Sequence, residues 1–207
     1  MKKLTVILLA ALFFCLSPAY ATTTDQNSGI TWSVDGTTLT ISGEGAIPDY
    51  ADPNHNFNNE STAPWYGMDI EKVIIEEGVT RIGKYAFGEM KNLKTVELPS
   101  TVAEVGCWAF AQCPITSITF SEPVYLECDV FEWCKELHSI IFESPVTLSG
   151  GSLSSCPSLT ALHFPDGTTD LGVSPFYNGA MKAVWIPDSV QNGEDNTRPS
   201  SKIFLQM

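Results

Sequence analysis

Apolar residues recur along this chain at a nearly constant interval, which indicates a structure built from repeated units. The units begin at Ile70, Leu93, Ile115, Leu137, Leu159 and Met181, at intervals of 23, 22, 22, 22 and 22 residues. Further apolar columns stay in register from unit to unit, at the positions that Val73, Ile82 and Phe87 hold in the first unit. A repeat of this length predicts a solenoid, in which each unit forms one coil and buries its apolar side against its neighbours.

The local pattern within a unit predicts short strands and a tight turn. Residues 93–98 alternate between apolar and polar, as in a strand with one buried face. Residues 79–83 predict a second extended segment, and residues 85–87 predict a tight helical turn. One coil cannot fold alone, because ordering about 22 residues costs about 33 kcal/mol, whereas its apolar side chains gain only about 10–20 kcal/mol. Stacking must supply the difference, and the end coils need caps.

The region before the repeat predicts an N-terminal β-hairpin cap. Residues 30–34 and 38–41 alternate in the same way and flank Asp35-Gly36, a strong hairpin signal. Trp32 and Trp65 are large enough to cover the first coil. This end of the solenoid is therefore expected to be closed by a hairpin and two indole rings.

The N-terminus predicts export. Lys2 and Lys3 precede an apolar run of about 13 residues, too short to span a bilayer, and Ala19-Tyr20-Ala21 provides a signal-peptidase site. We therefore expect a protein that is secreted, on the cell surface or in the periplasm, and that does not span the membrane. The predicted parts are a signal peptide (1–21), an N-terminal β cap with a polar, Asn-rich loop (22–69), a solenoid of about five 22–23-residue units plus a partial sixth (70–190), and a C-terminal cap or tail with one last short strand (191–207).

The composition excludes one class of partner. The chain has 24 acidic residues against 11 Lys and Arg, a net charge of −13. Nucleic acids require a basic footprint, so we expect no nucleic-acid binding. Hydrophobic residues make up 43% of the chain, which is enough to bury a core.

Three segments carry a resemblance to a known family. TWSVDGTTLTISGEGAIPDY, APWYGMDIEKVIIEEGVTRIGKYAF and LKTVELPSTVAEVGCWAFAQC resemble the BspA-like leucine-rich repeat proteins, and the resemblance covers roughly residues 30–190. It implies a right-handed leucine-rich-repeat solenoid of the α/β class, with the opening strands on one shared sheet. It also implies an exported protein linked to adhesion and host-protein binding, and it names no catalytic residue. Gly150-Gly151, Leu153 and Ser174-Pro175 depart from the repeat, so the last two coils are expected to be irregular.

Five cysteines lie beyond the signal peptide and fall in two repeat columns. One column holds Cys107 and Cys128, and the other holds Cys113, Cys134 and Cys156. Neighbours in a column are expected about 4.8 Å apart, which nominally allows a disulfide. Their Cβ vectors would run parallel, however, whereas a disulfide brings the Cβ atoms to about 3.8 Å. We favour buried free thiols. The cysteine spacing without nearby histidines argues against zinc.

The residue types that catalysis requires do not form a recognisable pattern. His55, His138 and His163 fall at different repeat positions, and no nucleophile elbow, paired carboxylates or phosphate-binding loop is present. The acidic loop 49–58 fails the EF-hand pattern because Phe57 takes the glycine position. We therefore predict a protein that is not an enzyme and that has no catalytic residue, no cofactor and no metal.

The strand alternation turns two columns of side chains outward on the shared sheet. These columns are Lys72, Thr95, Ser117, Ser139, Ala161 and Ala183, and Ile74, Glu97, Thr119, Ile141, His163 and Trp185. Their C-terminal half is apolar and aromatic where solvent is expected, which is typical of an interaction site. The hypothesis is a binding module that recognises a protein partner, such as a host extracellular protein, through Ile141, His163 and Trp185, with Ala161 and Ala183 beside them.

Three alternatives to this hypothesis stay open. The C-terminal tail could fold over Trp185, two copies of the chain could pack through this face, or the module could bind carbohydrate with Trp185 as the stacking platform. Trp108 and Trp133 form a second candidate on the turn side of the coils. They occupy non-equivalent repeat positions, which favours packing between neighbouring turns over a shared platform.

Overall fold

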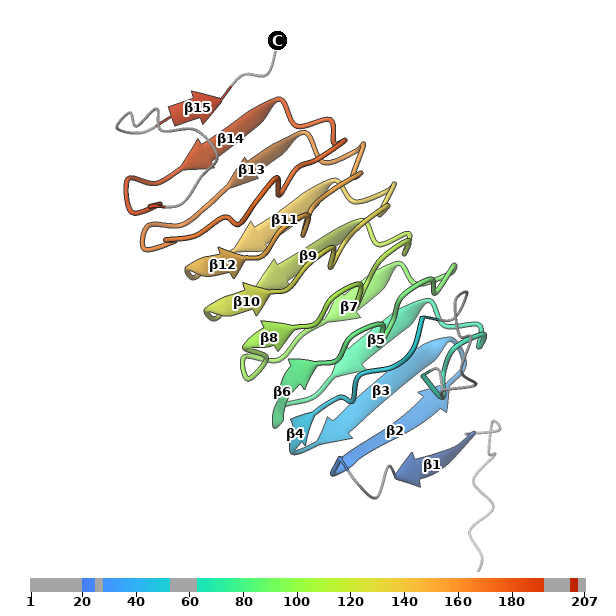
Figure 1. The fold of residues 1–207 in the computed structure, drawn as a ribbon. Helices are drawn as coiled ribbons and strands as arrows, with labels where there is room; N and C mark the ends of the chain where they lie inside the picture. The colour runs from blue at the N-terminus through green and yellow to red at the C-terminus, as the bar shows by residue number, and fades with distance from the viewer. Residues whose placement is uncertain (1–19, 25–27, 53–62, 192–201, 205–207) are drawn as a thin grey trace, which may run out of the picture.

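The computed structural model describes residues 20–24, 28–52, 63–191 and 202–204, which form a solenoid of stacked coils (Figure 1). Strands of two kinds alternate along the chain. On one side, called the first face, lie β1 (Tyr20–Thr24), β2 (Ile30–Asp35), β3 (Thr38–Gly43), β5 (Lys72–Ile75), β7 (Thr95–Glu97), β9 (Ser117–Phe120), β11 (Ser139–Phe142), β13 (Ala161–His163), β14 (Ala183–Ile186) and β15 (Lys202–Phe204). On the other side, called the second face, lie β4 (Gly45–Ala46), β6 (Val79–Ile82), β8 (Glu104–Val105), β10 (Val124–Leu126) and β12 (Val146–Leu148).

Parallel pairing between coils confirms the predicted repeat. The second face is one sheet in the order β12-β10-β8-β6-β4. The first face consists of three sheets in a row, β1-β2-β3-β5-β7, β9-β11 and β13-β14-β15, with β7 next to β9 and β11 next to β13. Equivalent residues of neighbouring coils are register partners, for example Val73 with Val96 and Ile118 with Ile140. The solenoid fold is therefore present, although hydrogen bonding divides the expected shared sheet into three.

The predicted hairpin forms before the first coil. β2 and β3 pair antiparallel from Ile30↔Gly43 to Asp35↔Thr38, and Gly36 adopts a left-handed conformation with φ 58° in the turn between them. β3 then pairs in parallel with β5, which joins the hairpin to the solenoid.

Stacked aromatic rings form the centre of the core. Trp65 lies on Phe87 with ring centroids 5.6 Å apart, and its indole N–H donates to the carbonyl of Ala86 at 2.6 Å. Phe87 stacks on Phe110 at 5.3 Å, and Phe110 stacks on Phe131 at 5.6 Å. The half-buried Trp32 meets Trp65 edge-on at 5.9 Å. The two tryptophans therefore cover the first coil, as the sequence predicts.

The prediction of tight helical turns is wrong, because no helix forms in the part of the chain that the structure describes. In the turn of the first coil, the backbone N–H groups of Tyr85 and Phe87 donate to Cys107 and Ala109 of the next coil, at 3.1 and 2.9 Å. Tyr85 and Glu89 adopt left-handed backbone conformations, with φ 53° and 62°. Hydrogen bonds between neighbouring coils, together with the left-handed conformations of Tyr85 and Glu89, take the place of the i to i−4 hydrogen bonds of a helix.

Both ends of the chain bear on earlier predictions. No second-face strand follows β12 among the described residues, and the pairing continues there as an isolated bridge between Thr147 and Asp170. The last coils are therefore irregular, as expected. β15 pairs antiparallel with β14, which confirms the predicted last short strand. Most of the predicted polar loop, residues 53–62, lies outside the described residues.

Candidate binding surface

The first face exposes the side chains that the alternation predicts. Ile141 is 49% exposed and Trp185 is 39% exposed. His163 and Ala161 are exposed, and Ala183 is half-buried. All five belong to β11, β13 and β14, so the structure places the predicted site residues on three neighbouring strands.

His163 and Trp185 form a stacked pair at the C-terminal end of this face. They are register partners on β13 and β14, and their ring centroids lie 5.9 Å apart with an interplanar angle of 20°. Since β11 adjoins β13, Ile141 continues the same outward column toward the middle of the solenoid. The column therefore presents one aliphatic and two aromatic side chains to solvent.

The C-terminal strand lies beside Trp185. β15 adds to the edge of β14 with Ile203 as the backbone register partner of Trp185. Antiparallel pairing extends the sheet sideways, and Trp185 keeps its 39% exposure. The alternative in which the tail folds over Trp185 stays a prediction, because residues 192–201 lie outside the described part of the chain.

A shallow hollow of ≈ 280 Å³ opens beside Trp185. Its other lining residues are Asp166, Gly167, Pro187, Asp188 and Ser189. These residues were not predicted as part of the site, because they lie beyond the strand ends, outside the columns that strand alternation defines. The repeat could have indicated two of them, because Asp166 and Asp188 occupy the same repeat position, three residues after His163 and Trp185 respectively.

Hydrogen bonds in two successive turns hold the carboxylate-bearing side of this hollow. The N–H of Thr168 donates to Pro165, and the N–H of Val190 donates to Pro187, each at 3.2 Å. Ser189 joins the two turns, because its hydroxyl accepts from the N–H of Gly167 at 3.1 Å and donates to the carbonyl of Thr168 at 2.7 Å. The backbone that bears Asp166 and Asp188 is thus fixed by hydrogen bonds within and between the two turns.

These two aspartates end a longer row of carboxylates, which we call the acidic rim. The rim follows the C-terminal ends of the first-face strands, and its exposed members are Glu76, Glu77, Glu122, Glu143, Asp166 and Asp188. The segments that hold this row, 76–78, 99–101, 121–123, 143–145, 165–167 and 187–189, contain no Lys or Arg. None of the ion pairs formed within the described residues involves Glu122, Glu143 or Asp166.

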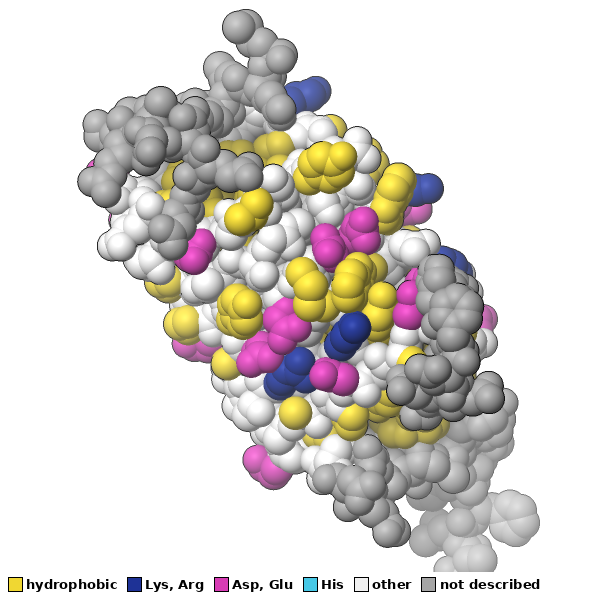
Figure 2. Space-filling model, in the orientation of Figure 1, with side chains coloured by type: hydrophobic (Ala, Val, Ile, Leu, Met, Phe, Trp, Pro, Cys, Tyr) yellow, Lys and Arg dark blue, Asp and Glu magenta, His cyan; other side chains and the backbone are white. Residues whose placement is uncertain are grey.

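The face turned toward the viewer in Figure 2 carries charged side chains of both signs. Figure 2 shows Lys and Arg side chains near its middle, with acidic and hydrophobic side chains close by and no His in view. Charges of both signs therefore mix on this face, in contrast to the rim.

The turn side carries the second aromatic candidate. Tyr85 and Trp108 stack with ring centroids 5.2 Å apart, and the Lys84 ammonium lies 5.1 Å from the Trp108 ring. Burial, with the Asp52 carboxylate, raises the pKa of Tyr85 above its usual value. The prediction of packing between turns is confirmed for Trp108. It is wrong for Trp133, which is 46% exposed, with Lys135 over its ring.

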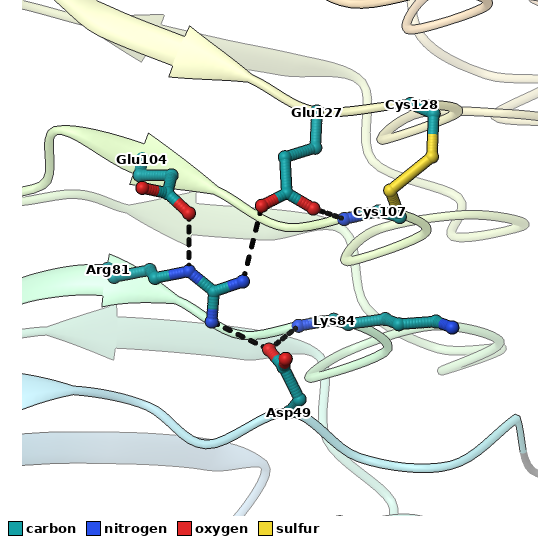
Figure 3. A network of polar contacts seen from close by, with 7 residues as sticks. All are labelled: Asp49, Arg81, Lys84, Glu104, Cys107, Glu127 and Cys128. Atoms are coloured by element: carbon teal, nitrogen blue, oxygen red, sulfur yellow. Dashed lines mark hydrogen bonds and ion pairs between the residues drawn. A yellow bond between two sulfur atoms is a disulfide. The ribbon is translucent and has the colours of Figure 1, made fainter.

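An arginine ties four successive coils together on the second face (Figure 3). Arg81 on β6 donates to Glu104 on β8 and to Asp49 after β4, each at 2.6 Å, and to Glu127 after β10 at 3.3 Å. Burial tends to raise the pKa of Asp49, but hydrogen bonds from the Lys84 N–H and the Arg81 guanidinium outweigh it and lower that pKa. All three branches of the guanidinium are engaged within the chain, so this network is structural.

Beside this network, Cys107 and Cys128 form a disulfide with their Cα atoms 4.7 Å apart (Figure 3). The prediction of free thiols is wrong for this pair. Both cysteines lie just after a strand, and the residues that follow them, Trp108 and Asp129, have left-handed φ values of 55° and 53°. The parallel Cβ vectors of a regular strand therefore do not apply, and the distance between coils falls within the range for a disulfide.

The other three cysteines confirm the prediction of buried free thiols. Cys113, Cys134 and Cys156 each donate a hydrogen bond to a carbonyl of the preceding coil, that of Phe87, Phe110 or Phe131, at 3.0, 3.1 and 3.1 Å. Burial raises the pKa of Cys113 and Cys156 to about 12. These thiols are neutral, and they brace the turns.

The described residues include no group of three or more His, Cys, Asp and Glu side chains placed to hold a metal ion. The same residues include no helix with the length and apolarity needed to cross a bilayer. Of the acidic loop, Asp49 and Asp52 are described, whereas Asn54, Asn56 and Asn58 lie outside the described residues.

Solved structures of similar proteins come from bacteria. A leucine-rich repeat protein from Eubacterium ventriosum ATCC 27560 is 29% identical, with a TM-score of 0.51 over 79% of this chain and 37% of that one. The pneumococcal vaccine antigen PcpA is 15% identical, with a TM-score of 0.55 over 82% of this chain and 50% of that one, a likeness of fold alone. A leucine rich cell surface protein from Faecalibacterium prausnitzii A2-165 is 21% identical, with a TM-score of 0.40 over 82% and 44%.

This chain thus spans half or less of the length of these three proteins. No curated protein matches it. Six copies of the BspA type leucine rich repeat region match residues 61–182, more than half of the chain. The repeat, the parallel coils and this match agree, and the chain belongs to the BspA-type leucine-rich repeat family.

Proposed function

We propose that this chain is an exported, non-catalytic binding module that recognises a protein partner through Ile141, His163 and Trp185. Export rests on the signal peptide that the sequence predicts in residues 1–21. Surface attachment and adhesion to a host protein are the roles that the resemblance to the BspA-like leucine-rich repeat proteins implies. The single observation that carries the binding site is the exposed column of one aliphatic and two stacked aromatic side chains on the first face.

Two physical arguments support a protein partner. Large aromatic side chains contribute most of the binding energy at protein interfaces when they become desolvated. A row of short parallel strands also offers a long, rigid surface, and repeat proteins commonly bind along such surfaces. Trp185 and His163 are held by strand pairing and by each other, so they lose little conformational freedom on binding.

The test is a binding array of extracellular-matrix proteins and glycans, probed with residues 22–207. The variant Ile141→Ser/His163→Ala/Trp185→Ala removes the proposed site. The control variant Thr95→Ala/Ser117→Ala/Thr119→Ala changes exposed residues in the N-terminal half of the same face. We expect a protein ligand that the first variant loses and the control keeps. Binding that survives the first variant would show that the site is elsewhere.

Carbohydrate binding is a second candidate function, and one observation favours it. Asp166 and Asp188 lie beside Trp185, and carboxylates next to an aromatic ring are suited to sugar hydroxyls. Titration of glycans followed by tryptophan fluorescence separates the two functions. Saturable quenching that the Trp185 variant loses would support the carbohydrate, and a size measurement on the same samples would reveal packing of two copies.

A further inference from the structure

The chemistry around Trp185 indicates the charge of the partner. We propose that the partner presents an Arg or Lys side chain that lies over the Trp185 indole, between the carboxylates of Asp166 and Asp188. This inference rests on the proposed function, because it specifies what the same surface recognises.

The hollow beside Trp185 combines the two features that a basic side chain requires. An indole face attracts a cation within about 6 Å of its centroid, and carboxylates accept charge-assisted hydrogen bonds from guanidinium or ammonium groups. Trp185, Asp166 and Asp188 line one hollow of ≈ 280 Å³, which is open to solvent. The aliphatic stem of Arg or Lys would pack on the apolar column that Ile141 begins.

The acidic rim makes this hollow attractive to a cation over a longer range. Glu143, Asp166 and Asp188 stand on three successive coils, whose strands are about 4.8 Å apart. Screening acts over about 8 Å at physiological ionic strength, so Glu143 adds to the field at Asp166. The absence of Lys and Arg from the rim segments leaves this field uncompensated within those segments. Oppositely charged partners are steered toward such a surface.

The same charge distinguishes the candidate ligands. A neutral sugar could hydrogen-bond to Asp166 and Asp188 but gains nothing from the charge of the rim, and an acidic peptide is repelled by that charge. An uncharged apolar segment would account for the indole but would desolvate the Asp166 carboxylate, which takes part in none of the ion pairs formed within the described residues. A basic, extended segment satisfies the indole, the aspartates and the rim together, so it is the occupant that we propose.

The experiment uses defined peptides in place of the unknown partner. Acetylated and amidated tetra-arginine is titrated into residues 22–207 while the indole ¹⁵N–¹H signal of Trp185 is followed by NMR. The citrulline analogue keeps the shape of the side chain but replaces one NH2 donor of the guanidinium with a carbonyl oxygen and carries no charge, and chitotetraose represents a neutral glycan. Asp166→Asn/Asp188→Asn is compared with Glu76→Gln/Glu77→Gln, which removes two rim charges at the far end.

We expect saturable binding of tetra-arginine that weakens at least tenfold in Asp166→Asn/Asp188→Asn. The Glu76→Gln/Glu77→Gln control should change the affinity less than twofold, because those residues lie several coils away, beyond the screening distance. Equal binding of the citrulline peptide, equal losses in both variants, or no shift of the Trp185 signal would each overturn the inference. Preferential binding of chitotetraose would replace it with the carbohydrate function.

The array separates failure of this inference from failure of the proposed function. If a protein ligand is lost in the Ile141/His163/Trp185 variant but kept in Asp166→Asn/Asp188→Asn, the surface binds a partner without the basic contact. If the first variant keeps the ligand, both the site and the inference are wrong.

Discussion

Removal of the Cys107–Cys128 disulfide should lower the free energy of unfolding by about 3 kcal/mol. The two residues are 21 apart in sequence. Closing a loop of that length removes about 11 cal/mol/K of entropy from the unfolded chain, which is about 3 kcal/mol at 25 °C. The hydrogen bond from the Cys107 N–H to Glu127 involves no sulfur, so Cys107→Ser/Cys128→Ser leaves the neighbouring contacts in place.

Urea denaturation followed by circular dichroism measures this loss. The wild-type residues 22–207 and the double variant are compared with and without dithiothreitol. The reductant should lower the unfolding midpoint of the wild type to that of the variant, and it should leave the variant unchanged. Thiol titration in denaturant provides an independent count: three reactive thiols before reduction and five after it, since five cysteines lie in residues 22–207.

Either of two results would refute this reasoning. Five thiols in the unreduced, denatured protein would mean that the disulfide is absent. Three thiols together with an unchanged urea midpoint in the double variant would mean that the disulfide does not reduce the entropy of the unfolded chain as calculated. In that second case the loop-entropy argument fails even though the bond exists.

Two further predictions concern the core and the Arg81 network. Phe110→Ala, which removes a ring stacked between Phe87 and Phe131, should cost about 3–5 kcal/mol by urea denaturation; a cost under 1 kcal/mol would contradict the stacked core. Asp49→Asn should reduce stability at about pH 7, and this difference should vanish as the pH falls through the lowered pKa of Asp49. The sign follows because a carboxyl with a depressed folded pKa stabilises above its unfolded value of 3.8 and loses that contribution below it. A difference independent of pH would contradict the ion pair with Arg81.

Much of the fold follows from periodicity alone. A 22–23-residue interval places Val73, Val96 and their equivalents in one column, and stacking then requires that they be buried together. Alternation within the strands decides which side chains face solvent, so Ile141 and Trp185 could be predicted as exposed. Both arguments depend only on the strands, where backbone geometry is regular.

The errors lie in the turns, where geometry varies from residue to residue. Residues 85–87 suit a helical turn and a left-handed turn equally well by composition, and bonding to the next coil decides between them. The disulfide was missed for the same reason, because the left-handed conformations at Trp108 and Asp129 redirect the chain beside each cysteine. Neither Trp108 nor Asp129 is a glycine, the residue from which a left-handed conformation is usually predicted.

The candidate surface lies on the coils with the fewest regular supports. The Arg81 network, the disulfide and the closest ring stacks all lie on the turns that follow β4, β6, β8 and β10 or on these strands, whereas Phe164 meets Phe176 at 6.3 Å with a tilt of 38°. In a solenoid each coil is stabilised by its neighbours, so distant braces cannot hold Trp185 in place. Its position depends on pairing with β13 and β15 and on the Ser189 bonds between the two last turns. The residues that hold the acidic hollow together are therefore local, and its two carboxylates, Asp166 and Asp188, stand on the same turns that brace it.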